Sequence, residues 1–273
     1  MVLRHVLLPV LLFFGLTASV SAFEVTGLYK AEAVVTGREE PERSRGFREG
    51  IEEVLGKLTA VSPFPAGPAL QDALADPAPF VAAFEYEDRK KGIPIHDEQG
   101  TRDRSYILRM TLDRSRIDGL IAQMGLRKWQ ADRPRLAILL AIRDGRGGYL
   151  LTRDGESGFG QREVLISAAA RRGVPIVMPS EVERVAGKLE PGVFALPAAE
   201  ISRVARDLDG DGALAGELTL DPDGQGWSVR WMLHGLSAGG EWQMKGVSFD
   251  VALAAGIDRA ARALAGAQTQ KQP

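Results

Sequence analysis

The segment from Arg135 to Ile142 restricts the possible folds of this chain more than any other. It reads RLAILLAI, an almost continuous apolar run with the length of one strand. A strand that is apolar on both sides has to be covered on both faces, which is typical of a sheet lying between layers of helices. The segment therefore predicts an α/β fold of mixed α+β character, with helices covering a mixed β-sheet.

Apolar patterns divide the rest of the chain into two small modules. Residues 80–86 and 106–112 alternate as strands do, and residues 43–58 carry one apolar helical stripe. With a strand before them and a helix after them, these patterns predict an N-terminal β-α-β-β-α module at residues 23–125. The polar stretch between the two strands, residues 87–104, is interpreted as a long exposed connection.

A C-terminal α/β module is expected at residues 126–268, followed by a disordered tail at residues 269–273. Its last strands form a hairpin that should extend the sheet antiparallel, before a final Ala-rich helix. The expected elements are strands at 135–142, 149–152, 174–178, 214–220, 227–233 and 242–249, and helices at 161–172, 198–208 and 251–265. In the first module, Pro63, Pro65 and Pro68 predict that regular structure ends after the helix.

The first 22 residues have the composition of a cleavable export signal. A short basic start precedes an apolar stretch at residues 6–16, and small residues lead to a cut after Ala22. The apolar stretch is shorter than the roughly 20 residues that a membrane-spanning helix needs, and no later stretch approaches that length. We therefore expect a soluble, periplasmic mature protein that starts near Phe23 and has no transmembrane segment. The alternative is an uncleaved membrane anchor.

Cysteine content and charge exclude several classes of site and partner. The chain has no cysteine, so a disulfide, a lipid anchor on an N-terminal cysteine and a Cys/His zinc site are impossible. Its 34 Lys and Arg are balanced by 36 Asp and Glu, without the concentrated positive surplus that phosphate neutralisation requires. We expect no nucleic-acid partner and no cofactor.

A tryptophan and two arginines are the candidate binding residues. Trp129 and Arg133 stand directly before Pro134 and the buried strand, and Arg172 ends a predicted helix. One hypothesis places Trp129, Arg133 and Arg172 in a binding groove between the modules. The other, which we prefer for the first two, is structural: the Trp129 ring wedges between the modules, and Arg133 stacks or caps carbonyl groups.

The sequence D-L-D-G-D-G resembles the opening of a calcium-binding loop. Asp207, Asp209 and Asp211 supply oxygens at positions 1, 3 and 5, and Gly212 follows at the tight turn. The match fails at position 12, where Leu218 stands in place of a bidentate glutamate. The alternative interpretation is an Asp-Gly turn between a helix and a strand.

No catalytic set is recognisable in the sequence. Only His96 and His234 remain after the export signal, and there is no G-x-S-x-G nucleophile turn. Paired carboxylates would suffice for hydrolysis of a glycan. Candidate carboxylates occur in two exposed stretches, Asp97, Glu98 and Asp103 in one and Asp221 and Asp223 in the other. We assign no catalytic residue, and two buried carboxylates facing one cleft would favour an enzyme.

Several spaced motifs resemble those of a known family. They are W-x-x-x-R-P (Trp129 to Pro134), A-x-R-R-G-V-P-I-V-M-P (Ala169 to Pro179), G-E-L with W-x-V-x-W (Gly216 to Trp231) and I-D-R-A-A-R-A-L-A (Ile257 to Ala265). With the export signal, they resemble a family of exported proteins of Gram-negative bacteria that is catalogued only as a domain of unknown function, number 2066. The resemblance implies a compartment, the cell envelope, but no reaction.

Two functions follow as hypotheses. The first is a non-catalytic envelope accessory or binding module that holds an envelope protein or a cell-wall polymer at its sheet edge or in the groove between the modules. The alternative is a carboxylate-dependent hydrolase that acts on an envelope glycan or peptide.

Overall fold

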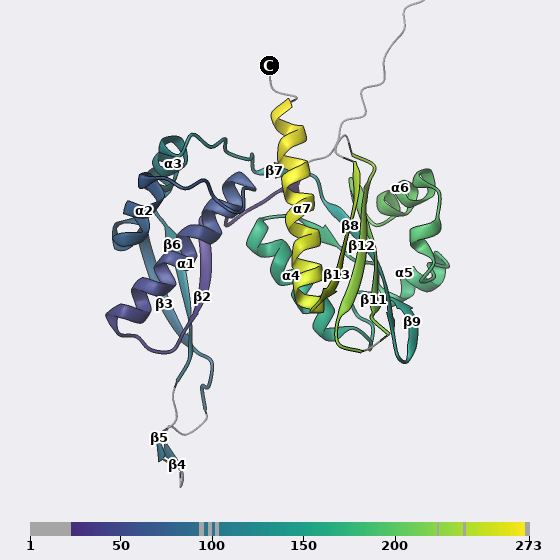
Figure 1. Ribbon diagram of the computed structural model, residues 1–273, viewed down its shortest axis with the longest axis horizontal. Helices are drawn as coiled ribbons and strands as arrows, with labels where there is room; N and C mark the ends of the chain where they lie inside the picture. The colour runs from purple at the N-terminus through teal and green to yellow at the C-terminus, as the bar shows by residue number, and fades with distance from the viewer. Residues whose placement is uncertain are drawn as a thin grey trace, which may run out of the picture.

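The computed structural model describes residues 23–92, 96–97, 100–101, 104–222, 224–236 and 239–270. It does not describe residues 1–22, where the export signal is expected, or residues 271–273. Glu98, Asp103 and Asp223 also lie outside the described residues, as do the side chains of His96 and Asp97. Figure 1 shows two sheets side by side, each accompanied by helices, with the long helix α7 standing between them. The expected mixture of helices and sheets is confirmed.

The first sheet is three-stranded and antiparallel. Its order is β2 (Lys30–Val35), β6 (Tyr106–Leu112) and β3 (Val81–Asp88), so β6 is central and β2 and β3 are the edges. Side chains alternate along β2: Ala31, Ala33 and Val35 are buried, and the residues between them are exposed. The buried face packs against α1 (Glu40–Thr59), whose Phe47, Ile51, Val54, Leu55 and Leu58 form the centre of this core.

Shorter elements complete the first part of the chain. α3 (Arg114–Gln123) begins after Asp113, whose carboxylate accepts a hydrogen bond of 2.9 Å from the Arg116 N–H, as expected for an N-cap. Regular structure ends after α1 as predicted, because residues 60–67, which include Pro63 and Pro65, form no helix or strand. The prediction is wrong for Pro68, which opens α2 (Pro68–Ala75), and proline suits the first turn of a helix. The remaining elements are the 3₁₀ helix Ala78–Phe80 and the strands β1 (Phe23–Glu24), β4 (His96–Asp97), β5 (Gly100–Thr101) and β7 (Asp132–Arg133).

The second sheet is mixed and is built around β8 (Leu136–Asp144). β8 pairs parallel with β11 (Gly212–Leu220) on one side; on the other it pairs parallel with β10 (Ile176–Val177) and antiparallel with β9 (Gly147–Leu150). The hairpin of β12 (Trp227–His234) and β13 (Gly240–Val247) continues the sheet antiparallel from β11, as expected.

Helices cover both faces of this sheet, which explains the apolar run in β8. On one face, Leu136, Ile138, Leu140 and Ile142 pack with α4 (Phe159–Arg172) and α7 (Phe249–Gln270). On the other face, Ala137 and Leu139 pack with α6 (Ala198–Asp207). α5 (Glu181–Ala186) and the 3₁₀ helix Val193–Ala195 lie on the side of α6 (Figure 1).

Some boundaries differ from the sequence-based expectation. α5 was not predicted, although Ser180 and Glu183 form a capping box, a recognisable start signal for a helix. α7 continues to Gln270, so its last two residues extend into the stretch expected to be a disordered tail. Within the described ranges, no helix is both long and apolar enough to cross a membrane.

Candidate functional site

A buried arginine joins the two halves of the molecule. Arg133 lies in β7, in the segment that leads into β8, and its side chain is fully buried. Its guanidinium donates hydrogen bonds to the carbonyl oxygens of Lys57 (2.8 Å) and Gly173 (2.7 Å), at the C-terminal ends of α1 and α4. Carbonyls at a helix C-terminus carry partial negative charge. The cation is therefore favourably placed between two such ends.

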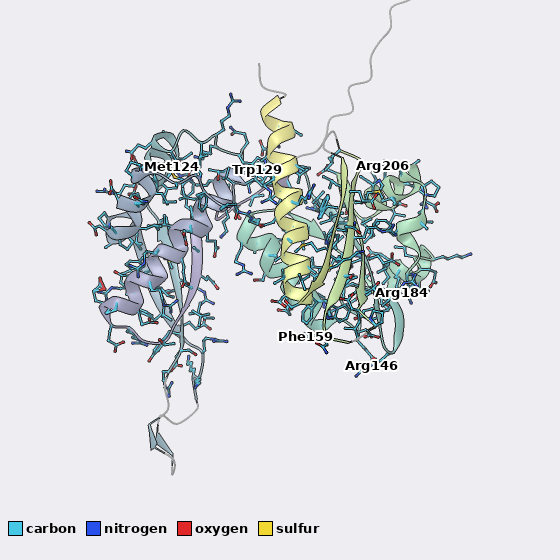
Figure 2. All side chains as sticks on the ribbon, in the orientation of Figure 1. Met124, Trp129, Arg146, Phe159, Arg184 and Arg206 are labelled. Atoms are coloured by element: carbon cyan, nitrogen blue, oxygen red, sulfur yellow. The ribbon has the colours of Figure 1, made fainter. Side chains whose placement is uncertain are left out.

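Trp129 covers the same guanidinium. The Arg133 Cζ atom lies 3.8 Å from the centroid of the Trp129 ring, and the Arg133 Nε donates to the Gln130 carbonyl at 2.8 Å. Figure 2 shows Trp129 in the region between the two sheets. Burial lowers the pKa of Arg133 to about 10, which leaves the side chain charged at neutral pH. The structure thus contains both contacts of the structural hypothesis, the stacking and the carbonyl caps.

Two glycines allow α1 and α4 to approach this arginine closely. Gly173 ends α4 with φ +59°, and a Cβ at this position would collide with the Arg133 guanidinium. A Cβ on Gly56 of α1 would lie 2.7 Å from the Arg172 Nη1 atom. Arg172 is itself buried and pairs with Asp258 of α7. We call Trp129, Arg133, Arg172 and Gly173 the Arg133 cluster.

A groove of about 590 Å³ lies between the edge strand β2 and the helix α4. Its walls come from β2, from the last two turns of α1 and from the second half of α4, together with Ile107 of β6 and Arg89, which follows β3. We call it the β2–α4 groove, and its residues are Gly27, Lys30, Ala31, Glu32, Ala33, Val34, Glu53, Lys57, Arg89, Ile107, Ser167, Ala170 and Arg171. Val34 is 49% exposed, so the groove has an apolar patch on its strand side.

The groove carries a surplus of positive charge. Its two acidic residues are already paired, Glu53 with Lys57 at 2.6 Å and Glu32 with Arg109 at 2.8 Å. Three further cations, Lys30, Arg89 and Arg171, are exposed, and none of them has an acidic partner among the residues that the structure describes. An anionic group entering the groove would meet unpaired positive charge without having to displace an existing partner.

The predicted binding residues meet in space but do not line this groove. Trp129, Arg133 and Arg172 are all buried in the Arg133 cluster. There Arg133 stacks on Trp129 and donates to main-chain carbonyls, including that of Arg172, and Arg172 pairs with Asp258. Their role as ligand-binding residues stays a prediction. What their geometry does provide is a fixed junction between α1 and α4, two of the elements that form the groove.

The calcium-like loop has other contacts in this structure. The Asp211 carboxylate accepts a hydrogen bond of 2.7 Å from the Arg135 N–H, and the Asp207 carboxylate pairs with Arg203 at 2.8 Å. Asp209 has φ +58°, a conformation that aspartate tolerates in turns. In the described part of the chain, no group of three or more His, Cys, Asp or Glu is placed to hold a metal ion. Calcium binding stays a prediction that these contacts do not support.

Carboxylates do gather in one hollow of about 620 Å³ beside β9 and α5. Asp154, Glu156, Glu181 and Glu190 all line it. The Asp154 carboxylate accepts a hydrogen bond from the Glu181 N–H at 2.7 Å and so caps α5. A hydrogen bond from Arg184 lowers the pKa of Glu181, the opposite of what a general acid requires.

Two buried carboxylates facing one cleft would have favoured a hydrolase. Across the described residues, the buried polar and charged side chains are Lys57, Thr59, Arg133, Thr152, Arg162, Arg172 and Ser180, and none of them is a carboxylate. Asp221 accepts a hydrogen bond of 2.6 Å from Ser228 in a turn, away from the hollow beside α5. The histidine that the structure describes fully, His234, ends β12, and burial lowers its pKa.

The sequence did not reveal the residues that line the groove. Lys30 and Arg89 come from strands of the first sheet or their ends, and Arg171 comes from α4 of the second half. Because these three residues are far apart in the sequence, no short motif connects them. The one available signal was the alternation in β2, which placed Lys30 and Glu32 on the exposed face of an edge strand.

Part of the chain matches a known domain model. Residues 22–130 match a domain of unknown function, DUF8605. The resemblance to an uncharacterised domain is therefore confirmed, but its number is not, because the matching model is not number 2066. The match ends before Arg133, so it leaves out nearly all the motifs on which the resemblance was based. No curated protein matches the chain.

Proposed function

We propose that this chain is an exported periplasmic accessory protein that binds an anionic segment of an envelope partner in the β2–α4 groove and catalyses no reaction. The observation that carries the proposal is the set of three exposed cations, Lys30, Arg89 and Arg171, which face one groove without acidic partners in the described residues. Charges of one sign along a cleft favour ligands of the opposite sign and speed their association.

Two of the helices beside the groove are also held by direct contacts. The Arg133 cluster joins the ends of α1 and α4, and Arg172 adds an ion pair to α7. A pre-formed groove loses less conformational freedom on binding than a mobile one. The proposal of export rests on the composition of residues 1–22.

The test is photocrosslinking in intact cells. A photoreactive amino acid replaces Ser167, which lines the groove on α4, and in a matched control it replaces Arg203, which is exposed on α6 on the opposite side of the second sheet. We expect adducts from position 167 and none from position 203. Equal adducts from both positions, or none from either, would contradict binding in the groove.

The same experiment distinguishes the two kinds of envelope partner. A protein partner gives an adduct of defined mass that yields peptides on proteolysis. A cell-wall polymer gives a broad adduct that collapses after treatment with a muramidase. Recovery of the chain in the cytosolic fraction with Met1 still attached would contradict the proposed export.

A further inference from the structure

The two edges of the first sheet are protected to different degrees. At β2, the carbonyl of Lys30 accepts a hydrogen bond from the Lys57 ammonium at 2.7 Å, and the carbonyl of Val34 accepts one from Arg45 at 2.9 Å. Such caps keep an edge strand from pairing with another chain. The β2 edge is therefore partly closed.

Among the residues that the structure describes, none caps the β3 edge in this way. The Arg89 N–H donates to the Ser105 carbonyl at 3.2 Å, so the main-chain groups of Arg89 point toward β6. In an antiparallel ladder every second residue points the same way, so the N–H and C=O groups of Glu87 and Glu85 also point toward β6. Those of Phe84 and Tyr86 then point away from the sheet. In the described ranges, no strand pairs with this side of β3, and no side chain is hydrogen-bonded to the main chain of either residue.

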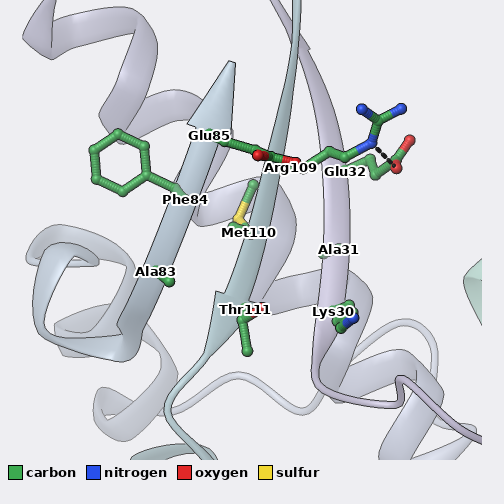
Figure 3. Close-up of a pocket in the computed structure, with 9 residues that line it drawn as sticks. All are labelled: Lys30, Ala31, Glu32, Ala83, Phe84, Glu85, Arg109, Met110 and Thr111. Carbon is green, nitrogen blue, oxygen red and sulfur yellow. Dashed lines mark hydrogen bonds and ion pairs between the residues drawn. The ribbon is translucent and has the colours of Figure 1, made fainter. Parts of the chain in front are cut away.

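The side chains beside this open edge differ between the two faces of β3. Phe84 is 47% exposed and continues a row of aromatic rings, with ring centroids 5.2 Å from Phe47 and 5.9 Å from Tyr86. Figure 3 shows Phe84 and Glu85 projecting from opposite sides of β3. Glu87 pairs with Arg109, whereas Glu85 is exposed and has no cationic partner in the described part of the chain.

We propose that the β3 edge receives an added strand from a partner polypeptide in which basic and apolar residues alternate. Its apolar side chains would lie beside Phe84 and Tyr86, and its basic side chains beside Glu85 and Glu87. Main-chain hydrogen bonds would join the added strand to β3. The alternation of apolar and basic residues in the partner would decide which of its faces lies beside the aromatic side chains and which beside the glutamates. Phe84, Glu85, Tyr86 and Glu87 do not line the β2–α4 groove, although Arg89, which follows β3, does. The β3 edge selects a partner whose charge is opposite to that of the partner in the groove.

The first test uses a labelled decapeptide in which lysine alternates with valine and tyrosine, and a second peptide with glutamate in place of lysine. Binding to the whole protein is followed by fluorescence anisotropy. We expect the lysine peptide to bind at least tenfold more tightly than the glutamate peptide, and the E85K variant to reverse that order. The matched control is E241K on β13, an edge strand of the other sheet, which should leave the order unchanged. No change in preference in E85K would overturn the proposal.

A second test separates strand addition from simple attraction between charges. In an extended peptide, the main-chain N–H groups of the apolar residues point to one edge and those of the lysines to the other. Two peptides are made, one N-methylated at the apolar residues and one at the lysines, so that each lacks the N–H donors along one edge. For antiparallel addition, methylation of the apolar residues should weaken binding at least tenfold, and methylation of the lysines should change it less than threefold. An equal effect of the two patterns, whether none or complete loss, would overturn strand addition.

Discussion

Arg133 is the residue whose loss should damage the fold most. Its guanidinium group donates hydrogen bonds to the carbonyls of Lys57, Gln130 and Gly173, and no carboxylate among the described residues pairs with it. In R133M, the carbonyls of Lys57 and Gly173, whose hydrogen bonds to Arg133 are buried, lose this donor, and an unsatisfied buried group costs about 1–3 kcal/mol. We expect the free energy of unfolding to fall by at least about 3 kcal/mol, measured by urea denaturation.

The matched control for this substitution is R146M. Arg146 is exposed in the turn before β9, and only its main-chain N–H has a described hydrogen bond. An exposed substitution of this kind changes stability by no more than about 0.5 kcal/mol. A loss in R133M as small as that in R146M would show that the guanidinium does not hold α1 and α4 together.

His234 should make stability depend on pH near neutrality. Burial lowers its pKa below the ordinary value of 6.5, and its Nε2 is buried without a hydrogen bond in the described residues. The unfolded chain therefore binds the proton more readily, so stability falls as pH drops through this value. We expect the urea midpoint to decrease between about pH 7.5 and about pH 5.5, and to decrease less in H234Q. An identical decrease in both proteins would assign the effect to other groups.

At the scale of elements, the ends of helices set how closely the two halves approach. Gly173 ends α4 at φ +59°, where the Arg133 guanidinium and Leu28 leave no room for a Cβ. Gly125 follows α3 at φ +66°, with no atom within 4 Å of its would-be Cβ. Both substitutions to alanine strain the backbone by about 1 kcal/mol, but only G173A also displaces Arg133.

These two glycines provide a matched pair. We expect G125A to lose about 1 kcal/mol and G173A to lose at least about 2 kcal/mol more, from urea midpoints measured side by side. Losses of equal size would mean that the close approach of α4 to Arg133 contributes nothing to stability.

Elements with a strong local pattern could be predicted from the sequence. The apolar run of β8 indicated burial on both faces, and both faces are covered. Aspartate is among the preferred residues at a helix N-cap, and Asp113 takes that place at the start of α3. α2 was missed because Pro68 was interpreted only as a breaker of regular structure, and α5 because it is a single short helix whose Ser180 signal was overlooked.

At the scale of the whole molecule, the groove depends on contacts between distant segments. Lys30, Arg89 and Arg171 lie in one groove because the Arg133 cluster fixes α4 beside the first sheet. The sequence indicated that Trp129 and Arg133 lie between the two modules. It did not indicate which exposed residues of the two modules would lie together in the β2–α4 groove. No pattern of local spacing contains that information.

The most direct measurement of the central claim is binding of a defined acidic probe. A labelled decapeptide of alternating glutamate and serine is titrated with the wild-type protein, with the variant K30E/R89E/R171E, and with a matched control, R127E/R146E/R206E, whose three arginines are exposed outside the groove. We expect the groove variant to bind at least tenfold more weakly than the wild type, and the control to keep most of the affinity. Equal affinity of the groove variant and the wild type would contradict the β2–α4 groove as the anion-binding site.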